Sequence, residues 1–124
     1  MMLDIKHATL GDILTVNLTG QLNTLGCGQL GEVLDGWLAT GGSNTLIDFA
    51  GVTYINSSGL RLLWRHHSLV SSKDGLVVFS SVHYTIFQVF DISGLAHLFQ
   101  FANTFDEALG RFQPPSADAP AEPA

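Results

Sequence analysis

Hydrophobic and polar positions along the chain switch repeatedly between two periods. Short apolar runs that are bounded by glycine, asparagine or serine predict strands. In one of these runs, polar residues occupy alternating positions. We place these strands at residues 2–7, 13–18, 45–49, 76–80 and 98–101. The Gly11-Asp12 pair between the first two runs predicts a hairpin turn.

Other segments repeat their apolar residues every three or four positions, which is typical of helices. The first such stripe ends at Gly41-Gly42 and consists of Leu30, Val33, Leu34, Trp37 and Leu38. The same segment also contains Gly26, Gly28, Gly31 and Gly36. Because each interior glycine costs up to about 1 kcal/mol relative to alanine, we expect the first turn to fray or to begin late.

Three more helices follow from the same periodicity. They are predicted over residues 57–71, over the stripe Val82, Ile86, Val89 and Phe90 that Gly94 closes, and after Thr104, where Glu107 completes a capping box. Strands that alternate with helices indicate an α/β domain over residues 1–112, with a mixed β-sheet packed against about four helices. Residues 113–124, QPPSADAPAEPA, hold no large apolar residue and are expected to form a disordered tail.

Composition narrows the classes of function. The 124 residues are 46% hydrophobic, and their formal net charge is −6 without any basic cluster, so nucleic-acid binding is disfavoured. No apolar run reaches about 18 residues, and the N-terminus lacks the features of a signal peptide, so we expect no membrane insertion. The single cysteine, Cys27, cannot form an internal disulfide, which fits a cytoplasmic protein.

The main candidate site lies where the apolar run after Leu46 meets a small polar cluster, Asn56-Ser57-Ser58-Gly59, at the start of a helix. Backbone N–H groups at a helix N-terminus lack intrahelical partners and favour negative charge. A phosphate on a serine there would be well accommodated. Ser57 is therefore either a phosphoryl acceptor or only the N-cap of this helix.

Residues near this turn have structural interpretations beside the functional ones. Arg61 lies one helical turn after Ser57, where it is either a solvated side chain or a contact for phosphate or a partner carboxylate. Asp48 is expected to be a turn or cap partner rather than a catalytic carboxylate. Trp64 is interpreted as a core residue or, alternatively, as an anchor for a partner.

Catalysis, cofactors and metals find no support in the residue pattern. His66 and His67 are adjacent and therefore cannot form an i, i+4 metal pair, and we expect His67 to be a core residue. A serine nucleophile needs a base and an oxyanion hole, for which the sequence shows no convergent groups, and the GxSxG motif is absent. We expect a protein that is not an enzyme and uses no cofactor or metal.

Several short segments occur together in a recognisable order. They are Leu18-Thr19-Gly20-Gln21-Leu22-Asn23, then Asp48, Val52, Tyr54 and Ile55 ahead of Asn56-Ser57-Ser58-Gly59-Leu60, then Ile92-Ser93-Gly94-Leu95, and finally Phe105-Asp106-Glu107-Ala108-Leu109. This ordered set resembles the STAS domains and, within them, the bacterial anti-sigma-factor antagonists. The resemblance spans about residues 2–112.

The resemblance implies a switchable binding module. In that family the unmodified domain binds an anti-sigma factor, often also a serine kinase, and so frees a sigma factor; phosphorylation breaks the complex and a phosphatase restores it. By motif position, Ser57 is the phosphorylated residue. We expect the partner surface to comprise Asn23, Thr24, Asn56, Ser58, Gly59, Arg61 and Arg65. The alternative is a constitutive STAS subunit of a transporter-associated or stress-signalling complex.

Two positions depart from the family pattern. Asn23 and Asn56 stand where the family commonly has Asp. Asparagine caps a helix about as well as aspartate, so the turn is kept while two negative charges are lost. The loss either lowers repulsion against a phosphate or removes groups that orient the serine for a kinase.

Overall fold

The structure, a computed structural model, describes residues 3–112. Five strands form one sheet in the order β1-β2-β3-β4-β5, in which only β1 and β2 pair in antiparallel fashion. The strands are β1 (Asp4–Leu10), β2 (Ile13–Leu22), β3 (Thr45–Ile55), β4 (Val77–Ser80) and β5 (Gln100–Ala102). The predicted mixed sheet and the hairpin turn between Leu10 and Ile13 are confirmed.

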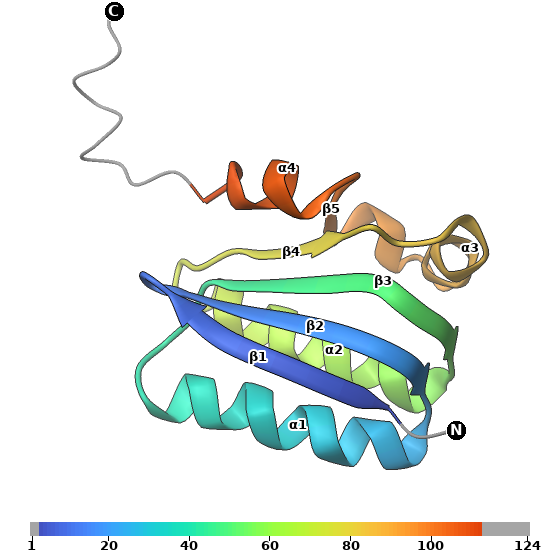
Figure 1. The fold of residues 1–124 in the computed structure, drawn as a ribbon, viewed down its shortest axis with the longest axis horizontal. Coiled ribbons are helices and arrows are strands. Elements are labelled where there is room, and N and C mark those ends of the chain that lie inside the picture. The colour runs from blue at the N-terminus through green and yellow to red at the C-terminus, as the bar shows by residue number, and fades with distance from the viewer. Residues whose placement is uncertain (1–2, 113–124) are drawn as a thin grey trace, which may run out of the picture.

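Four α-helices and one 3₁₀ turn connect or follow these strands. They are α1 (Thr24–Ala39), α2 (Ser57–Ser71), α3 (Tyr84–Ile92), η1 (Leu95–His97) and α4 (Phe105–Leu109). Figure 1 shows α1 and α2 side by side on one face of the sheet, whereas α4 lies on the opposite face. The prediction of an α/β domain with four helices is confirmed.

Two hydrophobic clusters hold the layers together. The larger one joins α1, α2 and α3 to the sheet, and its largest fully buried side chains include Phe49, Phe79 and Phe90, whose rings lie 5.7–5.9 Å apart. The smaller cluster lies under α4, where Ala108 packs with Leu46 of β3. Both faces of the central strands are therefore covered, which is why β3 and β4 read as almost continuous apolar runs.

The structure corrects several predicted bounds. β1 begins later than expected and continues to Leu10. β5 starts at Gln100 because the Leu98 and Phe99 N–H groups still donate to the Leu95 carbonyl at the start of η1. The third helix begins at Tyr84, two residues after the apolar stripe starts. Met2 and the predicted tail, residues 113–124, lie outside the described residues.

The longest corrections concern β2 and β3, which extend to Leu22 and Ile55, the last pair of their parallel ladder. Polar and glycine residues in both extensions hide the strand pattern in the sequence. The consequence is functional, because the two strands end side by side and deliver α1 and α2 to the same edge of the sheet (Figure 1).

The expected fraying of α1 is also wrong, because the helix begins at Thr24. The added Cβ of an alanine at position 26 would lie 2.9 Å from the Gln21 carbonyl oxygen, so Gly26 permits a close approach of helix and strand. The cost of a glycine in the first turn is therefore offset by tight packing against the end of β2.

Candidate functional site

Two helix starts meet at the edge where β2 and β3 end. Asn23 follows β2 and Asn56 follows β3, and the Asn56 backbone N–H donates to the Leu22 carbonyl at 3.3 Å. Five of the predicted site residues come together here: Asn23, Thr24, Asn56, Ser58 and Gly59.

The two asparagines cap their helices in the same way. The Asn23 side-chain oxygen accepts from the Gly26 N–H at 2.9 Å, and the Asn56 side-chain oxygen accepts from the Gly59 N–H at 3.1 Å. Ser57 is therefore the first residue of α2, and the interpretation of Ser57 as the N-cap is wrong. All four residues of the turn can cap in principle, but only Asn56 occupies the extended backbone position that a cap requires.

A short hydrogen-bond chain links the two helix starts. The Asn56 side-chain N–H donates to the Thr24 hydroxyl at 3.4 Å, and the Thr24 and Ser58 hydroxyls lie 3.4 Å apart. Thr24 and Ser58 are thus engaged with each other across the edge. The repeated Asn-x-x-Gly pattern at positions 23–26 and 56–59 is the sequence signal from which this pairing was predictable.

Ser57 differs from these neighbours. Its side chain is exposed, and its hydroxyl forms no hydrogen bond with any residue from 3 to 112. It lies at the first turn of α2, where unpaired backbone N–H groups and the helix dipole favour an added negative charge. The geometry therefore leaves the Ser57 hydroxyl accessible and without a hydrogen bond to the described residues, at a helix start that suits a phosphate.

The two predicted arginines of α2 differ in their surroundings. Arg65 pairs with Asp35 of α1 at 3.1 Å, and because both side chains are exposed this pair is worth at most about 1 kcal/mol. Arg61 has no hydrogen bond or ion pair with any residue in the described part of the chain. Burial raises the pKa of the Cys27 thiol, and the nearby Arg61 charge acts in the opposite direction.

Trp64 is not a core residue, since 49% of its surface is exposed. It lines a hollow of about 200 Å³ together with Leu60, Arg61 and Leu95, and a second hollow that includes Leu98. We call Leu60, Trp64, Leu95 and Leu98 the Trp64 patch. Leu60 and Trp64 lie on α2, which begins at Ser57, whereas Leu95 and Leu98 belong to η1 and its C-cap. An apolar side chain with a polar tip, as in Trp64, is typical of partner anchors.

The buried histidine is His66 rather than His67. His66 is 2% exposed, and its Nε2 lies 2.9 Å from the Thr45 hydroxyl, which itself donates to the Ser43 carbonyl. The ring therefore donates through Nε2, while the buried Nδ1 has no partner among the described residues. Burial lowers the pKa of His66 from 6.5 to about 4, so the ring is neutral at pH 7.

Asp48 is neither a turn residue nor a cap partner. It lies within β3, where one carboxylate oxygen accepts from the Ser80 hydroxyl at 2.9 Å and the other from the Asn17 amide at 3.1 Å. The carboxylate thus cross-links β2, β3 and β4. Among residues 3–112, no group of three His, Cys, Asp or Glu side chains is placed to hold a metal ion.

Comparison with known proteins adds a family. The sequence model of the STAS domain matches residues 4–108. No curated protein sequence matches the chain. Within the described residues, every helix is too short or too polar to cross a membrane.

Three solved structures illustrate the likeness. An anti-sigma factor antagonist from Mycobacterium paratuberculosis is 17% identical with a TM-score of 0.79, over 88% of this chain and 92% of that chain. The phosphorylated form of the Bacillus cell fate determinant SpoIIAA is 20% identical with a TM-score of 0.72, over 89% and 100%. A sulfate transporter family protein from Wolinella succinogenes is 16% identical with a TM-score of 0.72, over 84% and 87%. At these identities the likeness is one of fold.

Proposed function

The chain belongs to the STAS domain family, and from that premise we propose that it is an anti-sigma-factor antagonist switched by phosphorylation of Ser57. In this proposal the unmodified protein binds an anti-sigma factor in the cytoplasm and so frees a sigma factor. A serine kinase, often the anti-sigma factor itself, releases the complex, and a phosphatase restores it. Solved antagonists of similar fold support the binding role.

The observation that carries the proposal is the contrast between Ser57 and the hydroxyls beside it. Thr24 and Ser58 are engaged with each other, whereas Ser57 is exposed and forms no hydrogen bond with the described residues. Phosphorylation adds a charge of about −1.5 to −2 at pH 7. The start of α2 and Arg61 can accept this charge without refolding, because neither carries another anionic partner in the described structure.

The proposed partner surface combines three parts. The first is the paired helix starts, and the second is Arg61 with the neighbouring Arg65. The third is the Trp64 patch, which supplies apolar area next to the charge-sensitive turn. A partner that covers this surface would place its atoms against Ser57, so a phosphate there would introduce bulk and a desolvated charge into the interface.

The two asparagines support switching through electrostatics with little repulsion inside the domain. Asn56 donates through its amide to Thr24, a bond that an aspartate at this position is unable to donate. Asn23 and Asn56 also keep negative charge away from the proposed phosphate. Asparagine at positions 23 and 56 therefore has a physical rationale that does not depend on recognition by a kinase.

The alternative is a constitutive STAS subunit of a transporter-associated or stress-signalling complex. It is favoured by the same replacement of Asp by Asn56, if the missing carboxylate is what a kinase needs to orient the serine. In that case the surface would bind its partner at all times. An enzymatic role is not proposed, because no described histidine or carboxylate forms a hydrogen bond with Ser57.

The test is phosphorylation by the cognate kinase with ATP, followed by peptide mass mapping of the full chain. We expect phosphate on Ser57 and none on Thr24 or Ser58. A Ser58→Ala variant is the matched control and should still be modified at Ser57. Phosphate found only at other residues, or none with a kinase that binds the domain, would contradict the proposal and favour the constitutive alternative.

A further inference from the structure

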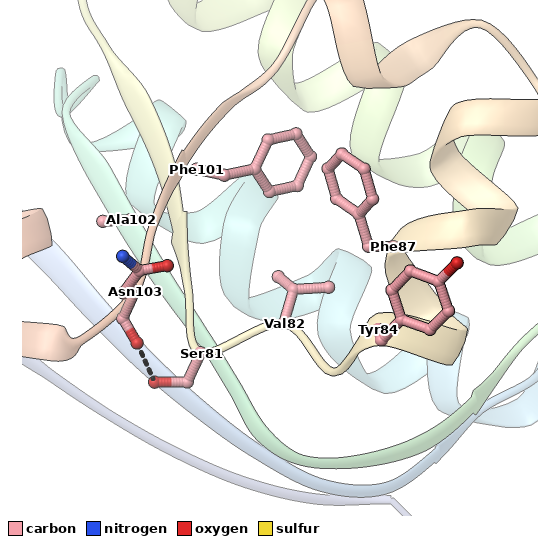
Figure 2. Close-up of a pocket in the computed structure, with 7 residues that line it drawn as sticks. All are labelled: Ser81, Val82, Tyr84, Phe87, Phe101, Ala102 and Asn103. Carbon is pink, nitrogen blue, oxygen red and sulfur yellow. Dashed lines mark hydrogen bonds between the residues drawn. The ribbon is translucent and has the colours of Figure 1, made fainter.

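An aromatic groove lies away from the paired helix starts, at the carboxyl ends of β4 and β5 (Figure 2). Its volume is about 380 Å³, and its lining residues are Ser81, Val82, Tyr84, Phe87, Phe101, Ala102 and Asn103. The rings of Phe87 and Phe101 meet edge to face at 5.1 Å and form one wall. Ligands of open α/β sheets commonly bind beyond the carboxyl ends of the strands.

The rim of this groove offers unused hydrogen-bond donors. Tyr84 is 74% exposed, and its hydroxyl accepts from the Gln88 amide at 3.2 Å, which leaves the hydroxyl proton available. The Asn103 side-chain amide forms no hydrogen bond with any residue that the structure describes, although the Asn103 carbonyl accepts from Ser81 at 3.4 Å. The groove thus combines an apolar aromatic wall with donors for carbonyl groups.

This combination fits a polyproline II segment. Such a segment presents proline rings to an aromatic surface, and its backbone carbonyls have no internal partners. Proline-rich PxxP segments dock in aromatic-lined grooves for these reasons, and their ordered conformation lowers the entropic cost of binding. The chain itself contains one such segment, Pro120-Ala121-Glu122-Pro123.

The segment is long enough to reach the groove. The chain path between Asn103, at the groove, and Phe112, the last described residue, spans at most about 24 Å, because α4 is helical. In a polyproline II conformation, Pro120 is about 25 Å and Pro123 about 34 Å from Phe112. Pro114 and Pro115 are adjacent in the sequence and therefore lack the PxxP spacing.

We infer that residues 120–123 dock intramolecularly in the aromatic groove formed by Tyr84, Phe87 and Phe101. The tether supplies an effective concentration in about the millimolar range, so even a weak proline-motif affinity populates the docked state. The inference is independent of the anti-sigma role and adds a second binding surface to the domain, occupied by the chain itself.

The test uses nuclear magnetic resonance of the full chain. Contacts are expected between the ring protons of Pro120 or Pro123 and those of Tyr84 or Phe87. Replacing both Pro120 and Pro123 by alanine should abolish these contacts and shift the amide signals of Ser81, Phe87 and Asn103. The double replacement Pro114→Ala with Pro115→Ala is the matched control and should leave the groove signals unchanged.

A second pair of variants tests the groove side. Tyr84→Ala should release the segment and move the Ala121 and Glu122 amide signals, whereas Tyr54→Ala, at another exposed tyrosine, should not. Groove signals that are the same in both proline variants would overturn the inference. Contacts that disappear on dilution would also overturn it, because they would show docking by a second copy.

Discussion

The starts of α1 and α2 share the same arrangement of residue types but differ in the hydrogen bonding of one hydroxyl. Each has an asparagine cap, a hydroxyl residue at the first helical position and a buried glycine at the third. Both residues are exposed, but in α1 the Thr24 hydroxyl accepts from the Asn56 amide, whereas in α2 the Ser57 hydroxyl forms no hydrogen bond with any described residue. What the two starts share serves the fold, and the difference identifies the position that is available for modification.

The contact between the two helix starts follows from the pairing of β2 and β3. Their ends are paired at Leu22 and Ile55, so Asn56 projects its amide toward Thr24 on one side. No described residue reaches Ser57 in the same way. The equivalent positions 24 and 57 thus differ in their hydrogen bonding.

The largest expected effect is on the pH dependence of the unfolding free energy, to which neither of the two helix starts should contribute. Neither cap titrates, because both are amides, so acid sensitivity should come from His66 rather than from the helix starts. Its pKa is about 4 in the fold against 6.5 for an unperturbed histidine. The stabilisation by the neutral ring is complete above pH 6.5 and is lost as pH falls toward 4, by about 3 kcal/mol in total.

Urea unfolding of wild type and His66→Leu at pH 7, 6 and 5 checks this. The pH slope of the unfolding free energy is the readout, so that any constant cost of the substitution cancels. We expect a clearly smaller slope in the variant. Equal slopes would assign the acid response to other groups.

The second prediction concerns the buried glycine that both helix starts have at their third position. An alanine Cβ at position 59 would lie 2.8 Å from the Ile55 side chain and 3.1 Å from the Leu22 carbonyl oxygen. Gly59→Ala should therefore destabilise by about 2 kcal/mol, and Gly26→Ala by a similar amount.

The matched control is Gly28→Ala, in the same helix as Gly26, because an added Cβ there meets nothing within 4 Å. This variant should gain up to about 1 kcal/mol from helix propensity. Thermal unfolding of the three variants gives the ranking. Melting temperatures that do not separate Gly59→Ala from Gly28→Ala would contradict the tight packing of α2 on the strand ends.

The third prediction compares the caps directly. Asn23→Ala removes one capping bond and should cost about 1 kcal/mol. Asn56→Ala removes the cap and also the bond to Thr24, so it should cost slightly more. Asn56→Asp is the control that retains the cap. Denaturant unfolding measures all three, and a larger loss for Asn23→Ala than for Asn56→Ala would speak against the link between the helix starts.

Some of this arrangement was predictable from the sequence. The bounds of α2, residues 57–71, are confirmed, because a small polar cluster and an apolar stripe mark its start and its buried face. Half of the predicted capping box of α4 is present: the Thr104 hydroxyl accepts from the Glu107 N–H at 3.0 Å, whereas the Glu107 carboxylate accepts from the Asn103 N–H at 2.6 Å and not from the Thr104 N–H. Local chemistry determines these features, so a local pattern reveals them.

The remaining features depend on tertiary contacts. Asn56 and Ser57 are both good caps, and only the path of β3 into the turn decides between them. His66 and His67 are about 100° apart on α2, so a small error in the phase of the apolar stripe exchanges the buried residue. Trp64 is exposed because η1 leaves a hollow beside it, which no periodicity in α2 reveals.

The central claim is that Ser57 gates binding by charge while the fold stays unchanged. The most direct measurement is the affinity of Ser57→Asp and Ser57→Ala for the cognate anti-sigma factor, together with circular dichroism and melting temperature. We predict at least tenfold weaker binding for Ser57→Asp, about 1.4 kcal/mol, with near wild-type folding, and unchanged binding for Ser57→Ala. Wild-type affinity in a folded Ser57→Asp protein would contradict the claim.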